Sequence, residues 1–260
     1  MSQVQSTAAP HYIKPSLHIF TDFDGTITQE DLGDALFRVF GEFDKYYPRL
    51  QRGELTVPEY WKLLCASITP ETTLEEMRSW ASKQAADPYF APFVRFCHDN
   101  NIPLTVVSDG FDVYIETVVE RELMPILGEG ERSTKFLPRY CNRLLRSENG
   151  IFAPFFPGRD ESCTCFCASC KRNSVLRNIP QNALIIYIGD GYSDFCAAEH
   201  ADIIFAKKSL AAYCNKHHLP HYPYTSFQDV QKIVEGLIAR RRLRSRHQAV
   251  LKRKLAFETE

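Results

Sequence analysis

Short runs of apolar residues recur along the chain, and each is followed by a segment with helical character. The runs LHIFTDF, PLTVVS, ALIIYIG and ADIIFA have the length and continuous apolarity of strands that are buried on both faces. Strands that alternate with helices favour a mostly parallel sheet covered by helices on both sides. The pattern therefore predicts a doubly wound, Rossmann-like α/β fold with strands at residues 17–23, 103–108, 183–189 and 201–206.

The interval between the first two predicted strands is about 80 residues long, far more than one crossover helix needs. Three segments within it have apolar residues at helical spacing. We therefore expect a helical cap at residues 31–86, inserted into a core made of residues 17–30 and 87–235. Residues 139–156 contain an Asn-Gly dipeptide and predict a β-hairpin. Residues 236–260 are expected to form a basic tail that continues the last core helix as one long helix.

Polar residues lie at the ends of three predicted strands. Asp22 and Asp24 end the first strand, Ser108 ends the second, and Asp190 follows the third. Ligands of open parallel sheets bind beyond the carboxyl ends of the strands. We therefore expect these side chains to converge on one site.

The segment DFDGTIT places the carboxylates of Asp22 and Asp24 two residues apart at a strand end, where they share a direction. Gly25 allows a sharp turn, and Thr26 can brace that turn through its hydroxyl. Two carboxylates this close repel each other unless a cation or a proton lies between them. An acidic surface turn is the alternative, but the position directly after a buried strand favours a functional pair.

The segment IGDGYSD adds two more carboxylates. Asp190 can ligate a hard cation, and Asp194, four residues later, can hold that cation or a water molecule from behind. The same residues also suit an ordinary helix start. Lys171, at the start of a predicted helix, offers a compact charge that can neutralise phosphate, although a lone lysine is more often a solvated surface residue.

The segment Ser108-Asp109-Gly110 offers donors for a phosphate oxygen. A hydroxyl group followed by a turn that a glycine opens presents an O–H and backbone N–H groups in one direction. The same three residues are also ordinary turn and capping residues. Their position after a predicted buried strand favours a role in binding phosphate.

These pieces, in this order, resemble the four motifs of the haloacid dehalogenase-like phosphatase superfamily over roughly residues 17–206. The helical insertion resembles the cap of the phosphoserine phosphatase branch. Asp31, the VVSDGFD segment and the cysteine-rich run before Lys171 resemble the methionine-salvage phosphatases that act on 2-hydroxy-3-keto-5-methylthiopentenyl-1-phosphate. Those relatives usually have glycine at the position of Asp109, and an added carboxylate there can alter substrate preference.

The resemblance implies a magnesium-dependent phosphatase that hydrolyses a small organic phosphate monoester. It implies that Asp22 attacks phosphorus and becomes an aspartyl phosphate, and that Asp24 protonates the leaving alcohol and then deprotonates water. It places Mg²⁺ at the Asp22 carboxylate, the Asp24 carbonyl and Asp190, with Asp194 behind them. The implied phosphate-binding residues are Ser108, Asp109, Gly110 and Lys171.

The residues that recognise the leaving group are expected in the cap. In the phosphoserine phosphatase branch, an acidic residue nine positions after the nucleophile contacts the substrate's ammonium group, and Asp31 has this spacing. Arg49 and Arg52 lie on the predicted cap and can bind a carboxylate or a hydroxyl-rich group. Alternatively, Asp31 only caps the first cap helix and both arginines are solvated.

The nine cysteines include four in one loop, Cys163, Cys165, Cys167 and Cys170. Four thiolates can form a tetrahedral zinc site, but structural sites usually combine two separated pairs, and this loop offers only eight residues. A disulfide or redox role and a reduced loop that positions Lys171 are the alternatives. We favour the reduced loop and expect purified protein to contain no stoichiometric zinc.

The composition is typical of a soluble globular protein, with 44% hydrophobic and 24% charged residues. The first residues lack the apolar core of a secretory signal, so we expect a cytoplasmic protein. The net charge is −1, but residues 236–260 are basic and leave the body near −7. We expect no nucleic-acid or membrane partner and a monomer or homodimer. The basic tail could contact RNA or anionic lipid, but a solvated helix is the simpler interpretation.

Two other functions use the same residues. A phosphotransferase transfers the phosphoryl group to an acceptor other than water, and a binding or regulatory module of this family has lost catalysis. The intact set of Asp22, Asp24, Lys171 and Asp190 argues against the second alternative. Hydrolysis of p-nitrophenyl phosphate with and without magnesium separates the phosphatase from the silent module.

Overall fold

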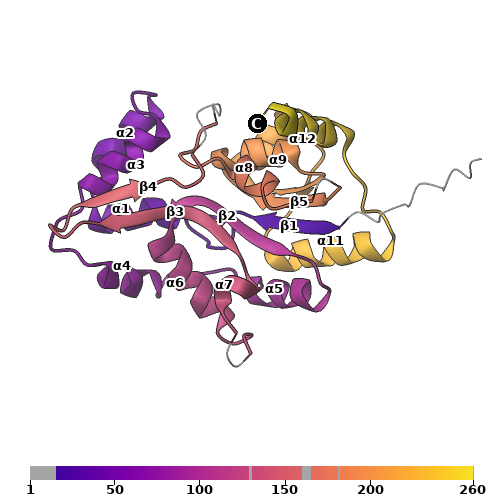
Figure 1. The fold of residues 1–260 in the computed structure, drawn as a ribbon, viewed down its shortest axis with the longest axis horizontal. Helices are drawn as coiled ribbons and strands as arrows, with labels where there is room; N and C mark the ends of the chain where they lie inside the picture. The colour runs from indigo at the N-terminus through magenta and orange to yellow at the C-terminus, as the bar shows by residue number, and fades with distance from the viewer. Residues whose placement is uncertain (1–15, 129–130, 160–164, 181, 260) are drawn as a thin grey trace, which may run out of the picture.

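A seven-stranded sheet forms the centre of the computed structural model, which describes residues 16–128, 131–159, 165–180 and 182–259 (Figure 1). The strand order is β4-β3-β2-β1-β5-β6-β7. β1 lies between β2 and β5, and both pairings are parallel. The strands are β1 Leu17–Thr21, β2 Leu104–Phe111, β3 Arg139–Arg146, β4 Phe152–Phe155, β5 Leu184–Gly189, β6 Ile203–Ala206 and β7 Tyr222–Pro223.

The predicted strands and fold class are confirmed. β1, β2, β5 and β6 each contain most of one predicted apolar run, and their side chains are almost all buried. β3 and β4 form the predicted antiparallel hairpin, with Gly150 at a positive φ of 78° in its turn. A glycine takes this conformation without the clash that a Cβ atom produces.

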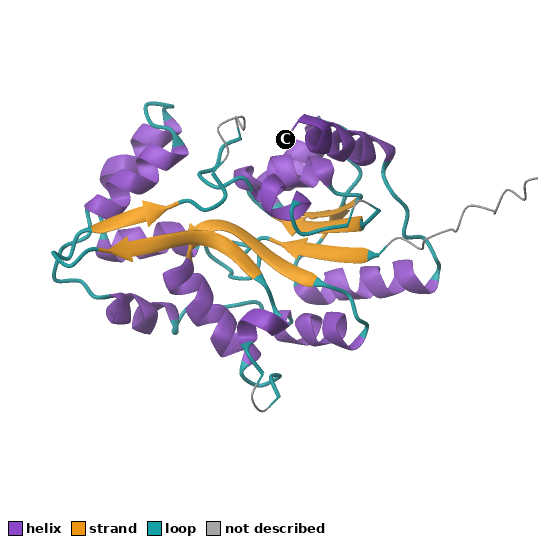
Figure 2. Ribbon diagram, viewed as in Figure 1, coloured by secondary structure: helices purple, strands orange, loops and turns teal. Residues whose placement is uncertain are grey.

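Helices cover both faces of the sheet (Figure 2). One face packs against α5, α6 and α11, and the other packs against α8, α9 and α10. No helix in the described part of the chain is long and apolar enough to cross a membrane. The helices after the insertion are α5 Phe90–Asp99, α6 Asp112–Leu123, α7 Ser133–Phe136, α8 Lys171–Leu176, the 3₁₀ helix η1 Tyr192–Asp194, α9 Phe195–His200, α10 Lys208–Lys216, α11 Phe227–Ala239 and α12 His247–Thr259.

The insertion after β1 is helical, and its two ends meet at an antiparallel bridge between Thr28 and Ala86. Thr56 and Thr73 begin α3 and α4 with capping boxes, because each hydroxyl accepts from a backbone N–H three residues later. The apolar side chains of the insertion belong to the same hydrophobic cluster as those of the sheet and α5. The helices of the insertion are α1 Leu32–Phe40, α2 Phe43–Gln51, α3 Val57–Ala66 and α4 Leu74–Ala81.

The C-terminal segment is two helices, so the prediction of one long helix was wrong. α11 ends at Ala239, and Arg241 takes a positive φ of 51° in the connection to α12. Arg246 then donates to the carbonyl oxygens of Ala198, Glu199 and Ala201 at 2.7 to 3.0 Å. These bonds to α9 hold the chain in a new direction, so α12 packs against the core instead of continuing into solvent.

Candidate active site

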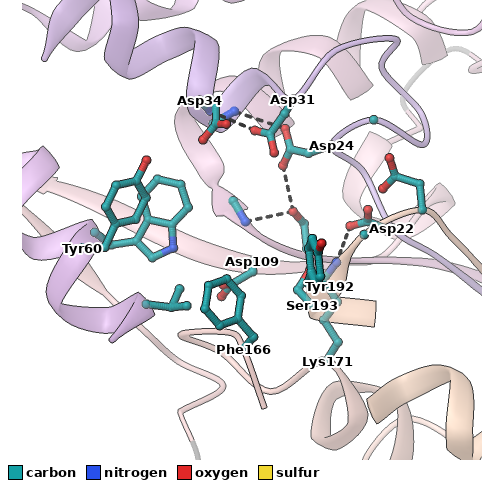
Figure 3. Close-up of a pocket in the computed structure, with 18 of the residues that line it drawn as sticks. Asp22, Asp24, Asp31, Asp34, Tyr60, Asp109, Phe166, Lys171, Tyr192 and Ser193 are labelled. Atoms are coloured by element: carbon teal, nitrogen blue, oxygen red, sulfur yellow. Dashed lines mark hydrogen bonds and ion pairs between the residues drawn. The ribbon is translucent and has the colours of Figure 1, made fainter. Parts of the chain in front are cut away.

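A cavity of about 300 Å³ opens between the carboxyl ends of the central strands and helices α1 to α3 (Figure 3). Its position agrees with the expectation for an open parallel sheet. Most of the predicted site residues line this one cavity. They are Asp22, Asp24, Asp31, Ser108, Asp109, Gly110, Lys171 and Asp190.

Asp22 lies directly after β1 at the floor of the cavity and is almost completely buried. Its backbone N–H donates to the Ile188 carbonyl at 2.8 Å, which continues the β1–β5 pairing and fixes the start of the turn. Its carboxylate accepts from the Lys171 ammonium at 2.5 Å. Burial and the nearby Asp194 raise the pKa of Asp22 well above its usual value, and the Lys171 charge opposes this shift.

Asp194 lies behind this pair and is fully buried. One of its oxygens accepts from Lys171 at 2.7 Å and from the Tyr187 hydroxyl at 2.7 Å. The other accepts from the backbone N–H groups of Asp190 and Gly191, both at 2.9 Å. With four donors, the Asp194 carboxylate holds Lys171 and the turn after β5 in one arrangement.

Asp190 faces the cavity from the end of β5, and its carboxylate accepts from Lys208 at 2.9 Å. The Gly25 backbone lies against it, because a Cβ atom built on Gly25 would come within 2.4 Å of an Asp190 oxygen. Gly25 also has a positive φ of 69°. The turn after Asp24 therefore needs glycine for both its conformation and this close approach.

The carboxylates of Asp22, Asp190 and Asp194 form a cluster in which one oxygen from each lies within 4.8 Å of the others. Burial and this mutual proximity raise the pKa of Asp22 and of Asp190. Carboxylate oxygens are the ligands that Mg²⁺ prefers, and a dication relieves the repulsion within such a cluster. The donor set therefore fits a hard divalent cation.

Asp24 contacts both the core and the insertion. One oxygen accepts from the backbone N–H groups of Leu32 and Gly33 at 3.0 and 3.3 Å. The other accepts from the Tyr114 hydroxyl at 3.0 Å and from Ser108 at 3.3 Å. Burial, and then the nearby Asp31, raise the pKa of Asp24 well above its usual value, so the site favours a protonated carboxyl at this position.

The predicted phosphate-binding segment lies where the pairing of β2 with β3 is irregular, between Val107 and Phe111. The Gly110 N–H donates to the Ser108 hydroxyl oxygen at 2.9 Å. Gly110 is also closely packed, since a Cβ atom there would come within 1.9 Å of the Tyr114 hydroxyl. The irregularity turns Ser108 and Gly110 toward the cavity that contains Asp24.

Asp109 has a different environment from the one predicted. Its carboxylate accepts from the backbone N–H groups of Ala168 and Ser169 at 2.9 and 2.7 Å, and from the Asn142 side chain at 3.1 Å. Although Asp109 lines the cavity, its oxygens hold the loop that leads into Lys171. The residue thus positions the loop, and a carboxylate with these donors does not offer a site for phosphate.

The upper wall of the cavity comes from the insertion and combines acidic with aromatic side chains (Figure 3). The Asp31 carboxylate accepts from the Asp34 N–H at 2.9 Å and caps α1, so it is both a capping residue and a cavity residue. The Tyr60 hydroxyl and the Trp61 indole N–H are buried and have no partner within the described residues. Both side chains line the cavity, so these groups are available to a ligand.

Arg49 and Arg52 are not among the residues that line this cavity, contrary to the prediction. Their guanidinium groups lie 3.5 and 2.6 Å from the Glu54 carboxylate; Arg52 is exposed and Arg49 is partly exposed. The α2 helix directs its apolar side chains Phe43 and Leu50 inward, which leaves the arginines at the surface. The structure therefore places both arginines beside Glu54 and outside the cavity lining.

The sequence interpretation missed several polar residues of the cavity, among them Lys208 and Tyr114. Lys208 follows β6 and pairs with Asp190, and the lysine run after ADIIFA carries the same strand-end signal that marked Asp22. Tyr114 lies in the first turns of α6 and donates to Asp24. Its spacing of four residues from Gly110 could have placed it on the helix that begins after the phosphate-binding segment.

Comparisons with known proteins show the family to which this chain belongs. The family model of haloacid dehalogenase-like hydrolases matches residues 19–199. The chain is 30% identical to a 2-hydroxy-3-keto-5-methylthiopentenyl-1-phosphate phosphatase of Brevibacillus brevis, over 84% of this chain and 95% of that protein. It is 29% identical to the protein of the same name from Lysinibacillus sphaericus, over 85% and 94%.

Solved structures share the fold at low sequence identity. A phospho-aspartyl intermediate analogue of phosphoserine phosphatase has a TM-score of 0.59 and 15% identity, and the match covers 85% of this chain and 99% of that one. Cytosolic 5′-nucleotidase IIIB bound to cytidine has a TM-score of 0.58 and 18% identity, over 86% and 85%. Both matches cover most of this chain.

Proposed function

Because this chain belongs to the haloacid dehalogenase-like hydrolases and is a phosphatase, we propose that it hydrolyses a small organic phosphate monoester through an aspartyl phosphate on Asp22, with Mg²⁺ as cofactor. The family membership that the four motifs predicted is thereby confirmed. The observation that supports the mechanism most strongly is the convergence of Asp22, Asp24 and Lys171 on one cavity.

Asp22 is the proposed nucleophile. Its carboxylate oxygen attacks phosphorus while the bond to the ester oxygen breaks, and a water molecule then attacks phosphorus and releases phosphate and free Asp22. The Lys171 ammonium, 2.5 Å from Asp22, lies where it can neutralise the phosphoryl oxygens. Asp194 keeps that ammonium in place, since it accepts from the same nitrogen at 2.7 Å.

Asp24 is the proposed acid and base. The raised pKa favours a protonated carboxyl, which can donate its proton to the leaving alcohol. The resulting carboxylate can then accept a proton from the attacking water. The backbone N–H groups of Leu32 and Gly33, at the start of the insertion, hold this carboxyl in position. The acid therefore depends on the placement of α1.

Mg²⁺ is the proposed cofactor, and Asp22 and Asp190 are the residues that would hold it directly. Asp194 supports them from behind, because its oxygens already accept four hydrogen bonds. When bound, Mg²⁺ stabilises the negative charge that develops on the phosphoryl oxygens. The mutual proximity of the three carboxylates supports this assignment.

The leaving group is proposed to lie against the insertion. A cavity of about 300 Å³ suits a short-chain monoester rather than a phosphorylated macromolecule. The relatives from Brevibacillus and Lysinibacillus are named for a small phosphorylated keto compound, which is of this size class. The unpartnered Tyr60 hydroxyl and Trp61 N–H can donate to oxygen atoms of such a leaving group.

A screen of small phosphate monoesters tests this proposal. Purified protein is incubated with each ester and with p-nitrophenyl phosphate, in Mg²⁺ or in excess chelator, and inorganic phosphate is measured. We expect phosphate release that depends on Mg²⁺. Equal rates in chelator would contradict the metal assignment, and no release from any ester would contradict the phosphatase. Recovery of the phosphoryl group on an added alcohol would instead indicate a phosphotransferase.

A further inference from the structure

Four cysteine side chains meet at one point next to the catalytic cavity, although they come from two separate segments. Cys165, Cys167 and Cys170 belong to the loop before α8, and Cys196 is the second residue of α9. Cys163, which the sequence grouped with the first three, lies outside the described residues. Cys196 lies 26 residues beyond Cys170 in the sequence, and no pattern connects it to the loop.

The sulfur atoms are close enough to share one ligand. Those of Cys165, Cys170 and Cys196 lie within 4.8 Å of one another. The thiol of Cys167 contacts those of Cys165 and Cys170. Zinc–sulfur bonds of about 2.3 Å in a tetrahedron put sulfur atoms roughly 3.8 Å apart. The sulfur atoms of Cys165, Cys170 and Cys196 are close enough to ligate one such ion, and Cys167, which contacts two of them, would supply the fourth ligand.

The local chain geometry also suits metal binding. Cys167 and Cys170 have the C-x₂-C spacing that is common in structural zinc sites, and Cys196 supplies a ligand from a second element. Cys170 is 2% exposed, and the other three cysteines of the cluster are partly buried.

The other described cysteines do not share this arrangement. Cys65, Cys97 and Cys214 are buried among apolar side chains, where burial raises the pKa of each thiol. A buried thiol in such surroundings behaves as a small apolar side chain. In the cluster, each thiol faces other thiols in place of apolar side chains. Packing as a small apolar side chain therefore gives these four residues little stabilisation. The described cysteines also form no disulfide.

We propose that Cys165, Cys167, Cys170 and Cys196 bind one structural zinc ion. Four protein ligands close the coordination sphere, so the ion has no open position for catalysis. This revises the expectation of a metal-free loop, because the objection to zinc was the short span of a single loop and Cys196 removes it. The site is separate from the carboxylate cluster and does not depend on the proposed phosphatase mechanism.

The position of this site gives it a definite structural role. Cys170 immediately precedes Lys171, and Cys196 follows Asp194 by two residues. A metal ion that joins Cys170 to Cys196 fixes α8 relative to α9, and therefore supports the 2.7 Å contact between Lys171 and Asp194. The zinc ion is thus expected to position the lysine, without contacting the substrate.

Metal analysis of the wild-type protein is the first test. The protein is purified without chelators, dialysed, and measured for zinc by mass spectrometry, with free thiols counted in parallel. We expect about one zinc ion per chain. Replacement by Co²⁺ is expected to give the strong visible absorption of tetrahedral cobalt thiolates. Less than about a tenth of a zinc ion per chain in reduced protein, or a disulfide within the cluster, would overturn the proposal.

Substitutions at Cys196 identify the ligands. Cys196→Ser is expected to weaken zinc binding at least tenfold, whereas Cys214→Ser, at a buried cysteine outside the cluster, is expected to leave it unchanged. Cys196→His supplies another zinc ligand and is expected to retain the ion. Full zinc binding in Cys196→Ser would overturn the assignment. If this variant does not fold, the zinc content and cobalt absorption of the wild-type protein still decide the question.

Discussion

The carboxylate of Asp109 occupies a position where phosphatases that resemble this chain usually have glycine. It does not face an anion, because it accepts from the backbone N–H groups of Ala168 and Ser169, just before Lys171. Burial raises the pKa of Asp109, and these hydrogen bonds oppose that shift. At the scale of single residues, Asp109 in place of glycine thus stabilises the loop that leads into Lys171.

Asp190 and Asp109 form a matched pair for testing the metal site. Asp190→Asn removes an anionic ligand, so the Mg²⁺ concentration for half-maximal activity is expected to rise at least tenfold, about 1.4 kcal/mol of binding free energy. Asp109→Asn is expected to lower stability and leave this concentration unchanged, because Asp109 belongs to the loop contacts. Magnesium titrations of both variants measure the difference. An unchanged requirement in Asp190→Asn would remove Asp190 from the metal site.

Asp34, on the first helix of the insertion, predicts a pH dependence of stability. Burial and the nearby Asp31 raise the pKa of Asp34 from 3.8 to about 7, and Arg38 opposes the shift. Between these values the folded chain holds a proton that the unfolded chain has lost. The free energy of unfolding therefore falls as pH rises through this window.

Asp34→Asn removes this titration. Its free energy of unfolding is expected to depend less steeply on pH between about 4 and 7 than that of the wild-type protein. Denaturant titrations in metal-free buffer at several pH values measure both slopes. Identical slopes in the two proteins would show that Asp34 titrates in its ordinary range.

At the scale of elements, Asp31 joins the first helix of the insertion to the cavity. It caps α1 and also lines the cavity, so its two roles need separate measurements. If Asp31 contacts the leaving group, Asp31→Ala is expected to lower kcat/KM for the true substrate far more than for p-nitrophenyl phosphate, which offers the insertion little to bind. If it only caps the helix, the two substrates are expected to lose equally.

Thr56→Ala provides the control for the capping role of Asp31. Thr56 caps α3 through the same kind of side-chain bond but is not among the residues that line the cavity. The Thr56→Ala variant is expected to have a lower melting temperature, because its free energy of unfolding falls by about 1 kcal/mol. The ratio of the two kcat/KM values is expected to stay unchanged. An equal loss on both substrates in Asp31→Ala would remove Asp31 from substrate recognition.

Local patterns in the sequence were sufficient to predict the sheet. Residues that are adjacent in the sequence determine the apolar runs at β1 and β5 and the Asn-Gly turn of the hairpin. They also determine the polar strand ends at Asp22 and Asp190. Features set by distant contacts were not predictable in this way. The charged residues between α11 and α12 are compatible with one continuous helix. The helix is interrupted there because Arg246 contacts α9, which lies far away in the sequence.

The side chains of the insertion and of the cysteine cluster show the same limit. The rotation of α2 about its axis decides whether Arg49 reaches the cavity, and that rotation depends on packing against the core. Cys196 joins the loop cysteines only because α8 and α9 lie side by side. Spacing along one loop could therefore suggest thiolate chemistry but not the fourth ligand.

At the scale of the whole molecule, the insertion and the sheet share one continuous hydrophobic core. The bridge between Thr28 and Ala86 joins the segment that enters the insertion to the segment that leaves it. Thr28 is a few residues from the proposed acid Asp24. Asp24 in turn accepts from Leu32 and Gly33, at the start of the insertion. A displacement of α1 therefore also changes the environment of the acid, which links the insertion to the proposed chemistry.

The most direct test of the account is the turnover of Asp22→Asn beside that of the wild-type protein, at saturating Mg²⁺. The amide cannot form an aspartyl phosphate, so phosphate release from p-nitrophenyl phosphate is expected to fall by several powers of ten, with each ~1.4 kcal/mol of lost stabilisation costing a factor of ten. Circular dichroism of the variant should match the wild type. If the folded variant keeps more than about a tenth of the wild-type rate, which is within ~1.4 kcal/mol of the same barrier, Asp22 is not the nucleophile.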